Sequence, residues 1–407
     1  MRRVVISGIG VISPVGNEID TFWDNIVSGN CGIGYITRFD TTGYKAKVAA
    51  EVKDFEPARY MEKSEARKTD LYAQYAVAGA SLAMEDSGLS DIAPERLGVY
   101  VGSGIGGLQT MSDELYKLSE KGPGRTSPFL IPMMISNIAA GKIAIKYNAQ
   151  GPCLPVVTAC ATSSHAVGEA FRAIKYGHAD AIIAGGSEAS IIPIAVAGFT
   201  SCMALSLTES PADACVPFDR RRSGFIMGEG AGILILEEYE HAIKRGAKIY
   251  AEISGYGNTC DAYHITAPHP EAVCSARAIE YAMQEAGMTG DNIYINAHGT
   301  STPMNDKTET LAIKKALGEE RARKALISST KSMTGHMMGA AGGVEAIVCA
   351  LALKNGIIPP TIGYKEPDPD CDLNYVPNVA VKKEIDSAIS ISLGFGGHNA
   401  CIAFKKI

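Results

Sequence analysis

Short runs of β-branched and other apolar residues alternate along the chain with longer segments of helical periodicity. The apolar runs cover residues 96–102, 179–186, 231–237, 293–297 and 325–330. Each run has the length of a buried strand, and the segments between them have the length of helices. The alternation predicts an α/β fold in which helices cover buried strands on both faces.

One of the helical segments extends from Ser64 to residue 88. Leu71, Tyr75, Ala78 and Leu82 recur in it at helical spacing. Because serine side chains satisfy the free N–H groups at helix starts, we expect Ser64 to cap this helix.

A short internal sequence similarity indicates a duplicated architecture. The strand-like VVISGIG near the start is similar to YAEISGYG at 250–257, and each run leaves through Gly-x-Gly. At 407 residues the chain exceeds one ordinary core, so two fused halves are expected, 1–248 and 249–407. No linker-like segment separates them, which predicts that they pack as one body.

Charge and composition narrow the class of protein. The formal net charge is −6 without long runs of one sign, which argues against a nucleic-acid or anionic-membrane partner. No run of about 18 apolar residues occurs, so no membrane span is expected. The 10 cysteines are scattered without a CxxC pair, as is typical of reduced thiols in a cytoplasmic protein.

The glycine-rich stretch GSGIGG at 102–107 follows a strand-like run and satisfies the dinucleotide fingerprint G-x-G-x-x-G. That fold needs a second strand ending in an acidic residue about 20 positions later. A polar helix and a Pro/Gly loop follow instead. We therefore expect these glycines to permit close backbone approach, and we expect no nucleotide.

Cys160 is the first candidate for chemistry. It follows the β-branched run VVT and precedes a helical pattern, so it is expected at a helix N-terminus, where free N–H groups favour a thiolate. A buried structural cysteine is the alternative, and this stretch alone does not decide between them. His298, and Lys331 with His336, also lie on turns just beyond strand ends, where sheet proteins assemble sites.

Four motifs in order carry a family resemblance over essentially the whole chain. They are TACATSSHA around Cys160, NAHGTSTP around His298, KSMTGHMMGAAG with Lys331 and His336, and GFGGHN at 394–399. Together they closely resemble the β-ketoacyl–acyl-carrier-protein synthases, above all the synthase II type of fatty-acid synthesis. The resemblance implies the layered αβαβα thiolase fold, two similar halves with a five-stranded sheet each, and a homodimer.

The resemblance also implies an acyltransferase mechanism that needs no metal or organic cofactor. Cys160 takes an acyl chain from its carrier as a thioester, and the N–H groups of Cys160 and Phe395 form the oxyanion hole. Malonyl-carrier then loses carbon dioxide, neutral His298 and His336 stabilise the enolate, and a 3-oxoacyl-carrier forms. Two histidines point to elongation, because initiating synthases carry asparagine at the second position. Lys331 is a fixed positive charge near His336.

Further residues take supporting roles by the same resemblance. Glu309 joins the charge network of the lysine, although Asp306 and Glu309 also fit a capping box for the helix that follows. Further positions match the phosphopantetheine contacts (Thr300, Thr302), the blind end of the acyl pocket (Ile105, Phe199) and its gate (Phe395). As plain sequence, these are turn threonines and core apolar residues.

Acidic acyl carrier protein is the expected partner, so a basic patch is predicted beside the entrance. Lys63, Arg67 and Lys68 match a family contact region, and Arg125 adds to it. Charged helix faces are more often merely solvated.

Three departures and several alternatives qualify the resemblance. The mildest departure is Ser163-Ser164, where Gly-Thr or a similar pair is usual. Met203 replaces a basic residue near the carrier site. Ile391 replaces an asparagine where family members hold a structural cation around Asn296 and Glu345, so no metal is predicted. The alternatives are a polyketide ketosynthase, a thiolase using coenzyme A thioesters, and a non-catalytic chain-length partner subunit. A thiolase needs a second catalytic cysteine near the C-terminus, where Cys401 is expected to be structural, and chain-length subunits lack the nucleophile.

Overall fold

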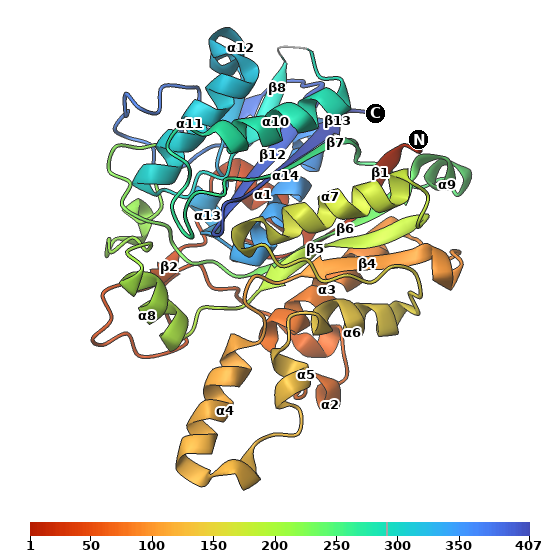
Figure 1. Cartoon of the computed structure of the whole chain (residues 1–407), viewed down its shortest axis with the longest axis vertical. Coiled ribbons are helices and arrows are strands. Elements are labelled where there is room, and N and C mark those ends of the chain that lie inside the picture. The colour runs from red at the N-terminus through yellow and green to blue at the C-terminus, as the bar shows by residue number, and fades with distance from the viewer. Residues whose placement is uncertain (290–291) are drawn as a thin grey trace.

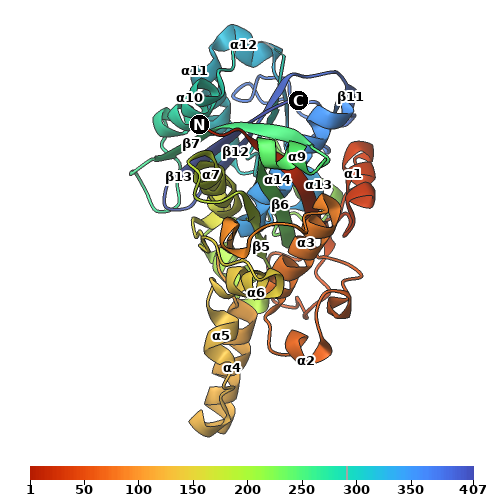
Figure 2. The same ribbon diagram turned by 90° about the vertical axis from the view of Figure 1, so that its right-hand side faces the viewer.

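The computed structural model describes residues 1–289 and 292–407 and shows a large mixed sheet with helices on both sides (Figures 1 and 2). The strands of this sheet are β1 (Val4–Ile12), β4 (Leu97–Gly102), β5 (Ala181–Glu188), β6 (Gly230–Glu238), β7 (Ala251–Cys260), β8 (Ile293–Asn296), β9 (Leu326–Ser328), β12 (Ser387–Gly394) and β13 (His398–Lys405). Two small ladders pair β2 (Gly34–Tyr35) with β3 (Val48–Ala49), and β10 (Ile357–Ile358) with β11 (Val381–Lys382).

The helices around the sheet are α1 (Ile19–Ser28), α2 (Lys63–Ala66), α3 (Leu71–Ser87), α4 (Leu108–Lys121), α5 (Leu130–Met134), α6 (Ile138–Tyr147), α7 (Thr162–Lys175), α8 (Pro193–Ser201), α9 (Tyr239–Lys244), α10 (Val273–Ala286), α11 (Pro303–Leu317), α12 (Glu319–Lys324), α13 (Lys331–Thr334) and α14 (Ala341–Asn355). The five apolar runs that the sequence singled out correspond to β4, β5, β6, β8 and β9.

The strand order repeats in the two halves of the sheet. The full order is β4-β5-β6-β1-β7-β13-β12-β8-β9, and a short antiparallel pairing of β1 with β7 joins the halves. Outward from that junction, β1-β6-β5-β4 is matched by β7-β13-β12-β8. In each series the first two pairings are antiparallel and the third is parallel. The predicted duplicated architecture is therefore confirmed, and the boundary expected after residue 248 falls between α9 and β7.

The expectation of five strands in each half is wrong for the first half. Where the second half adds β9, the first half has only a parallel bridge between Val99 and Cys153. Pro152 and Pro155 flank that bridge and have no N–H to donate, so a longer ladder does not form. Residues 156–158, expected as a strand, are likewise not part of the sheet.

The helices form layers around the sheet. α3 packs on β1 and β6, and α10 packs on β7 and β13, so these helices cover the outer faces. α7 and α14 each contact strands of both halves and form the middle layer. This is the layered αβαβα arrangement that the sequence predicted. The stretch Met338–Asn355 is long and apolar enough to span a membrane, but 89% of it is buried inside the protein, as in a core helix.

The repeated Gly-x-Gly has the same packing role in both halves. A Cβ on Gly10 of β1 would lie 2.1 Å from the carbonyl oxygen of Gly79 in α3. A Cβ on Gly257 of β7 would lie 1.8 Å from the carbonyl oxygen of Ala278 in α10. Neither helix could cross its strand this closely over any larger residue.

The expected cap of the helix near residue 64 is wrong. Ser64 lies inside the short α2, and the long helix α3 begins only at Leu71. Asp70 caps α3 by accepting a hydrogen bond from the Tyr72 N–H. The same carboxylate also accepts bonds from the N–H and hydroxyl of Thr110, which links α3 to α4.

Candidate active site

Cys160 lies in the one-turn helix Ala159–Ala161, directly before α7. The preceding residues are extended but unpaired, so the cysteine follows a turn rather than a strand. Ala159 has a φ of 51°, a left-handed conformation that is uncommon for a residue with a Cβ. The turn places the half-buried thiol on the wall of a cavity.

This cavity has a volume of about 430 Å³ and collects residues from both halves of the chain. Its walls include most of the predicted catalytic and phosphopantetheine-binding residues, namely Cys160, His298, Thr300, Thr302, His336 and Phe395. The Thr300 and Thr302 hydroxyls lie 2.9 Å apart and share a hydrogen bond. The volume of the cavity lies within the usual range of small-molecule sites.

The thiol of Cys160 is held mainly in its neutral form. Burial raises its pKa to about 12, against the opposing effects of the Lys331 charge and of the N–H groups of Cys160 and Phe395. The helix N-terminus alone therefore does not create the thiolate that the sequence indicated. The same two N–H groups point at the Cys160 sulfur. If Cys160 carried an acyl group, they would lie beside the carbonyl oxygen of its thioester.

His298 and His336 stand edge to face, with their ring centroids 5.2 Å apart and an interplanar angle of 87°. The His336 Nδ1 accepts a hydrogen bond from the Met338 N–H at 3.3 Å, so the neutral ring carries its proton on Nε2. That Nε2 is buried without a partner in the described residues. Burial and the Lys331 charge keep the pKa of both histidines well below their usual range. Both rings are neutral at physiological pH.

Lys331 is almost fully buried and pairs with Glu345 of α14. Glu309 also holds the His298 turn, because its carboxylate accepts the N–H groups of His298 at 2.6 Å and Gly299 at 2.7 Å. Burial raises the pKa of Glu309 to about 7, while those N–H groups and Lys331 lower it. Glu309 thus fixes the histidine turn directly, whereas Glu345 neutralises the lysine.

The capping box expected from Asp306 and Glu309 does not form. α11 begins earlier, at Pro303, since proline at the first position of a helix needs no N–H partner. Asp306 is therefore inside the helix, where its carboxylate accepts the Phe218 N–H at 2.8 Å.

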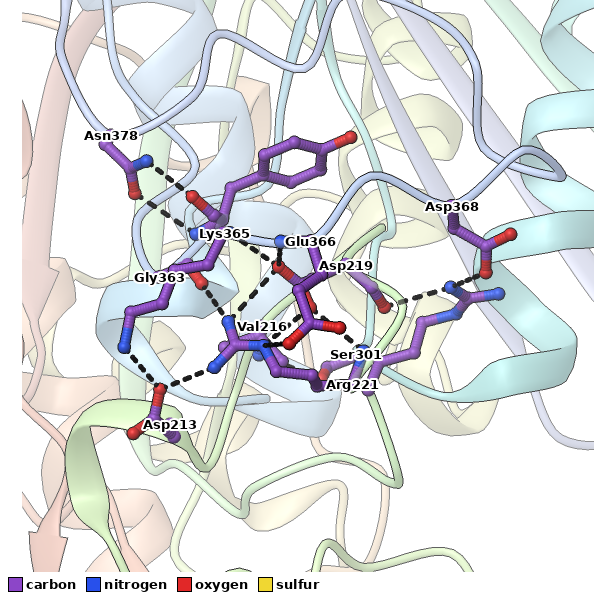
Figure 3. Close-up of polar contacts among 12 residues, drawn as sticks. Asp213, Val216, Asp219, Arg221, Ser301, Gly363, Lys365, Glu366, Asp368 and Asn378 are labelled. Carbon is purple, nitrogen blue, oxygen red and sulfur yellow. Dashed lines mark hydrogen bonds and ion pairs between the residues drawn. The ribbon is translucent and has the colours of Figure 1, made fainter.

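A network of ion pairs holds the loop after Phe218 against the C-terminal half (Figure 3). The buried Asp219 carboxylate accepts bonds from Arg221 and from the N–H groups of Lys365 and Glu366. The next residue, Arg222, pairs with Asp368 and also donates to the Pro303 carbonyl oxygen. The same loop therefore anchors the start of α11, just after the His298 turn.

The turn itself is tied to this loop. The Ser301 hydroxyl accepts the Val216 N–H at 2.9 Å (Figure 3). The Ser301 carbonyl oxygen accepts the Gly224 N–H at 3.0 Å. Ser301 has a φ of 66°, a strained conformation that these bonds hold in place.

Phe395 lines the cavity on a loop whose shape depends on glycine. Gly396 and Gly397 have φ values of 87° and 78°, in the left-handed region. A Cβ on Gly394 would lie 2.6 Å from the Thr158 carbonyl oxygen, so this loop approaches the Cys160 turn closely.

Ile105 and Phe199 do not line the cavity. The ring centroids of Phe199 and Phe225 lie 5.4 Å apart. Phe225 lines the cavity and also contacts the His336 ring. Ile105 lies on the glycine-rich loop and is partly exposed. Their place at the end of an acyl pocket stays a prediction.

The predicted basic patch is exposed. Lys63, Arg67, Lys68 and Arg125 all face solvent, and Lys68 lies 4.9 Å from the Phe129 ring centroid. None of the four makes an ion pair within residues 1–289 and 292–407. Their role in binding a carrier protein stays a prediction.

Other singled-out residues have plainer surroundings. Met203 is 88% exposed at the cavity rim, and Cys401 is buried in β13, outside the cavity lining. Ile391 is buried as well, and both polar side-chain atoms of Asn296 lack partners in the described residues. The absence of a structural metal stays a prediction.

The glycine-rich stretch at 102–107 permits close approach, as expected. A Cβ on Gly102 would lie 1.9 Å from the Val156 carbonyl oxygen, and a Cβ on Gly107 would lie 2.3 Å from that of Met133. The polar helix α4 follows it. Glu188, which touches this loop, and Phe225 were missed because a single acid or phenylalanine in an apolar segment carries no motif.

Comparison with known proteins agrees with the geometry. The model of the β-ketoacyl synthase N-terminal domain matches residues 1–242, and that of the C-terminal domain matches residues 250–365. The chain therefore belongs to the β-ketoacyl synthase family. This family membership makes it a ketosynthase of the acyltransferase class, as its four motifs indicated.

Among its relatives are two curated proteins named 3-oxoacyl-[acyl-carrier-protein] synthase 2. The one from Synechocystis sp. is 49% identical and the one from Staphylococcus aureus is 50% identical, each with 100% of this chain and 98% of the relative covered. These similarities agree with a role in fatty-acid elongation.

Solved structures share the fold closely. A β-ketoacyl synthase from Burkholderia phymatum is 32% identical with a TM-score of 0.92, and all of both chains is covered. A type II polyketide ketosynthase in complex with its acyl-carrier protein is 36% identical with a TM-score of 0.93, covering 100% of this chain and 99% of that one. The polyketide enzyme is less similar in sequence than the two proteins named 3-oxoacyl-[acyl-carrier-protein] synthase 2.

Proposed function

We propose that the chain condenses malonyl–acyl-carrier-protein with an acyl group bound to Cys160, as a 3-oxoacyl-carrier synthase of fatty-acid elongation. The observation that carries the proposal is the meeting of one thiol with two neutral, edge-to-face histidines in a single cavity. The full-length identity of about half the residues to synthases of this name supports the same reaction.

The first step is acyl transfer to the cysteine. The Cys160 sulfur attacks the carrier thioester, the thiol proton passes to the departing carrier thiolate, and an acyl-Cys160 thioester remains. The N–H groups of Cys160 and Phe395 stabilise the negative oxygen that forms on the way. Because burial keeps the thiol neutral, its proton must leave as the new bond forms.

The second step forms the carbon–carbon bond. Malonyl-carrier loses carbon dioxide, and the electron pair moves onto its thioester oxygen as an enolate. His336 donates its Nε2 proton as a hydrogen bond to that oxygen, and His298 lies beside it for the same purpose. The enolate carbon then attacks the acyl-Cys160 carbonyl, which expels the Cys160 sulfur as a thiolate and yields the 3-oxoacyl-carrier. The thiolate takes up a proton from water, which restores the neutral thiol. Thioester carbonyls accept the charge throughout, so no cofactor is proposed.

The overall reaction is tested by supplying a medium-chain acyl-carrier and malonyl-carrier and measuring the carrier products by mass spectrometry. A 3-oxoacyl-carrier two carbons longer, with carbon dioxide released, is the expected product. Repeated extension into a poly-3-oxo chain would instead favour a polyketide ketosynthase, and no turnover with an intact fold would favour a non-catalytic partner subunit.

Replacing either histidine should slow decarboxylation selectively. We expect His298→Ala and His336→Ala each to lower the rate about 100-fold, the usual cost of one lost donor to a developing oxyanion, with acylation of Cys160 preserved. Release of labelled carbon dioxide from malonyl-carrier measures the step, and the exposed His178→Ala serves as control.

The pH dependence follows from the same histidines. Their lowered pKa means that the neutral, active rings persist below 6.5, the ordinary histidine value. The decarboxylation rate should therefore stay flat as pH falls from about 8 to about 6. A loss of rate with a midpoint near 6.5 would contradict the proposed neutral donors.

The partner proposed for the basic patch is acyl carrier protein, whose acidic surface complements exposed Lys63 and Arg67. The double variant Lys63→Glu/Arg67→Glu should raise KM for acyl-carrier about tenfold and weaken its salt dependence, with kcat little changed. Lys382→Glu/Lys383→Glu, at and beside the distant β11, makes the same change of charge on another exposed surface and is the matched control. An equal effect of both changes would indicate general charge rather than a docking surface.

We further propose a cytoplasmic homodimer. α4 projects from the body of the molecule and exposes Leu115, Tyr116 and Leu118 (Figures 1 and 2). The sheet edge beside β4 exposes Leu154 and Val157. Apolar side chains gathered on a protrusion and on an open sheet edge are typical of surfaces covered by a second copy.

A further inference from the structure

A fully buried carboxylate that the condensation does not use lies beneath the Cys160 turn. Glu188 ends β5, at the carboxyl end of the parallel pair β4 and β5. Its Oε1 accepts the Ser103 hydroxyl at 2.8 Å, and its Oε2 accepts the N–H groups of Gly104 at 2.9 Å and Gly339 at 3.1 Å. One side chain therefore connects two separate loops.

Both loops bear on the active site. Gly104 belongs to the glycine-rich loop with Ile105, and a Cβ on Gly104 would lie 2.9 Å from Glu188 Oε2 and 3.3 Å from the Ala159 carbonyl oxygen. Gly339 lies in the turn Met338–Ala340, whose Met338 N–H fixes the His336 ring. Gly104 thus lies between Glu188 and the turn that carries Cys160. Gly339, which Glu188 also binds, follows the residue whose N–H fixes the His336 ring.

We propose that Glu188 is a positioning residue that holds the Cys160 turn between these two loops and restrains ionisation of the thiol through its negative charge. The inference rests on the proposed role of Cys160 as the nucleophile. It assigns a role in the reaction to a residue outside the four motifs.

The electrostatic part follows from the groups that face the two side chains. The charge of Glu188 raises the pKa of Cys160, whereas the charge of Lys331 lowers it. Glu188 also faces Tyr72 of α3, whose pKa is raised. Burial raises the pKa of Glu188 itself to about 7, so its charge grows as pH rises past neutrality. Below that pH the acid is neutral and no longer opposes the thiolate.

The test uses Glu188→Gln, which keeps the shape and removes the charge. Its amide oxygen can accept the two glycine N–H groups, and its NH₂ can donate to the Ser103 hydroxyl. The rate of Cys160 alkylation by iodoacetamide is followed from about pH 6 to about pH 10 by peptide mass. Above pH 7 the variant should react about threefold faster or more, since half a pKa unit changes the thiolate fraction by that factor, and below pH 7 the two proteins should converge.

Ser103→Ala is the matched control, because it removes one hydrogen bond to Glu188 and leaves the charge. The Ser103 bond lowers the pKa of Glu188, so its loss should delay the ionisation of Glu188 to higher pH. At about pH 10 this control should still be alkylated at the wild-type rate, unlike Glu188→Gln. If wild-type Cys160 is not alkylated at any pH, the proposed nucleophile fails. If it is alkylated, but Glu188→Gln follows the wild-type profile or the two variants shift alike, the proposed role of Glu188 fails.

Discussion

Cys160→Ala will abolish transfer of a medium-chain acyl group from its carrier to the protein. Wild-type protein incubated with acyl-carrier, without malonyl-carrier, should gain the mass of one acyl group, and the variant should gain none. Overall condensation should fall at least about 1,000-fold, because the two-step route through a thioester is lost. The proximity of the thiol to the Phe395 N–H is the physical reason to expect acylation at this residue.

The chain offers two informative controls for this experiment. Cys202 also lines the cavity, and Cys401 is buried in β13. Cys202→Ala and Cys401→Ala should both be acylated like the wild type, with the adduct in the peptide that contains Cys160. An adduct that persists in Cys160→Ala would move the nucleophile elsewhere, and no adduct on folded wild-type protein would exclude the acyl-enzyme route.

Lys331→Met should cost the protein about 3 to 5 kcal/mol of unfolding free energy. The ammonium group and its partner Glu345 are both almost fully buried, so removing the lysine leaves an uncompensated carboxylate in the core. Burial raises the pKa of Glu345 and the Lys331 charge lowers it, so Lys331→Met should raise the pKa of Glu345 further. Urea unfolding followed by circular dichroism measures the loss.

A compensating change separates charge from packing. Lys331→Met/Glu345→Gln should recover most of the lost stability, because no buried charge then remains. Lys307 pairs with Asp370 at the surface, and Lys307→Met should leave the urea midpoint unchanged. Equal instability of the single and double variants would mean that the lysine contributes by its shape and not by neutralising Glu345.

Local pattern was enough to predict five buried strands and to place Cys160, His298 and His336 on turns, whereas Thr300, Thr302 and Phe395 were assigned only by the family resemblance. Alternating apolar runs specify β4, β5, β6, β8 and β9 because a buried strand must be apolar on both faces. Cys160, His298 and His336 were recognisable because their motifs stand on turns, where side chains are placed for chemistry rather than packing.

Long-range pairing was not predictable in the same way. Glu345 is a single acid in the largely apolar helix α14. The sequence around it gives no sign that Lys331 is its partner. The neutral state of the Cys160 thiol depends on burial by residues from both halves, whereas the sequence displays only the helix start. The strand expected at 156–158 failed because β-branched residues describe a propensity, and the prolines nearby remove the donors that a ladder needs.

The junction between the halves bears on how such a chain is put together. β7 has β1 on one side and β13 on the other, with Val4 opposite Ile253 and Lys405 opposite Glu252. The two chain ends therefore emerge about 10 Å apart, twice the spacing of neighbouring strands. A few added residues would close the chain into a ring, and reopening it between α9 and β7 would exchange the two halves without moving an atom of the cavity. The site therefore depends on the contact between the halves and not on their order along the chain.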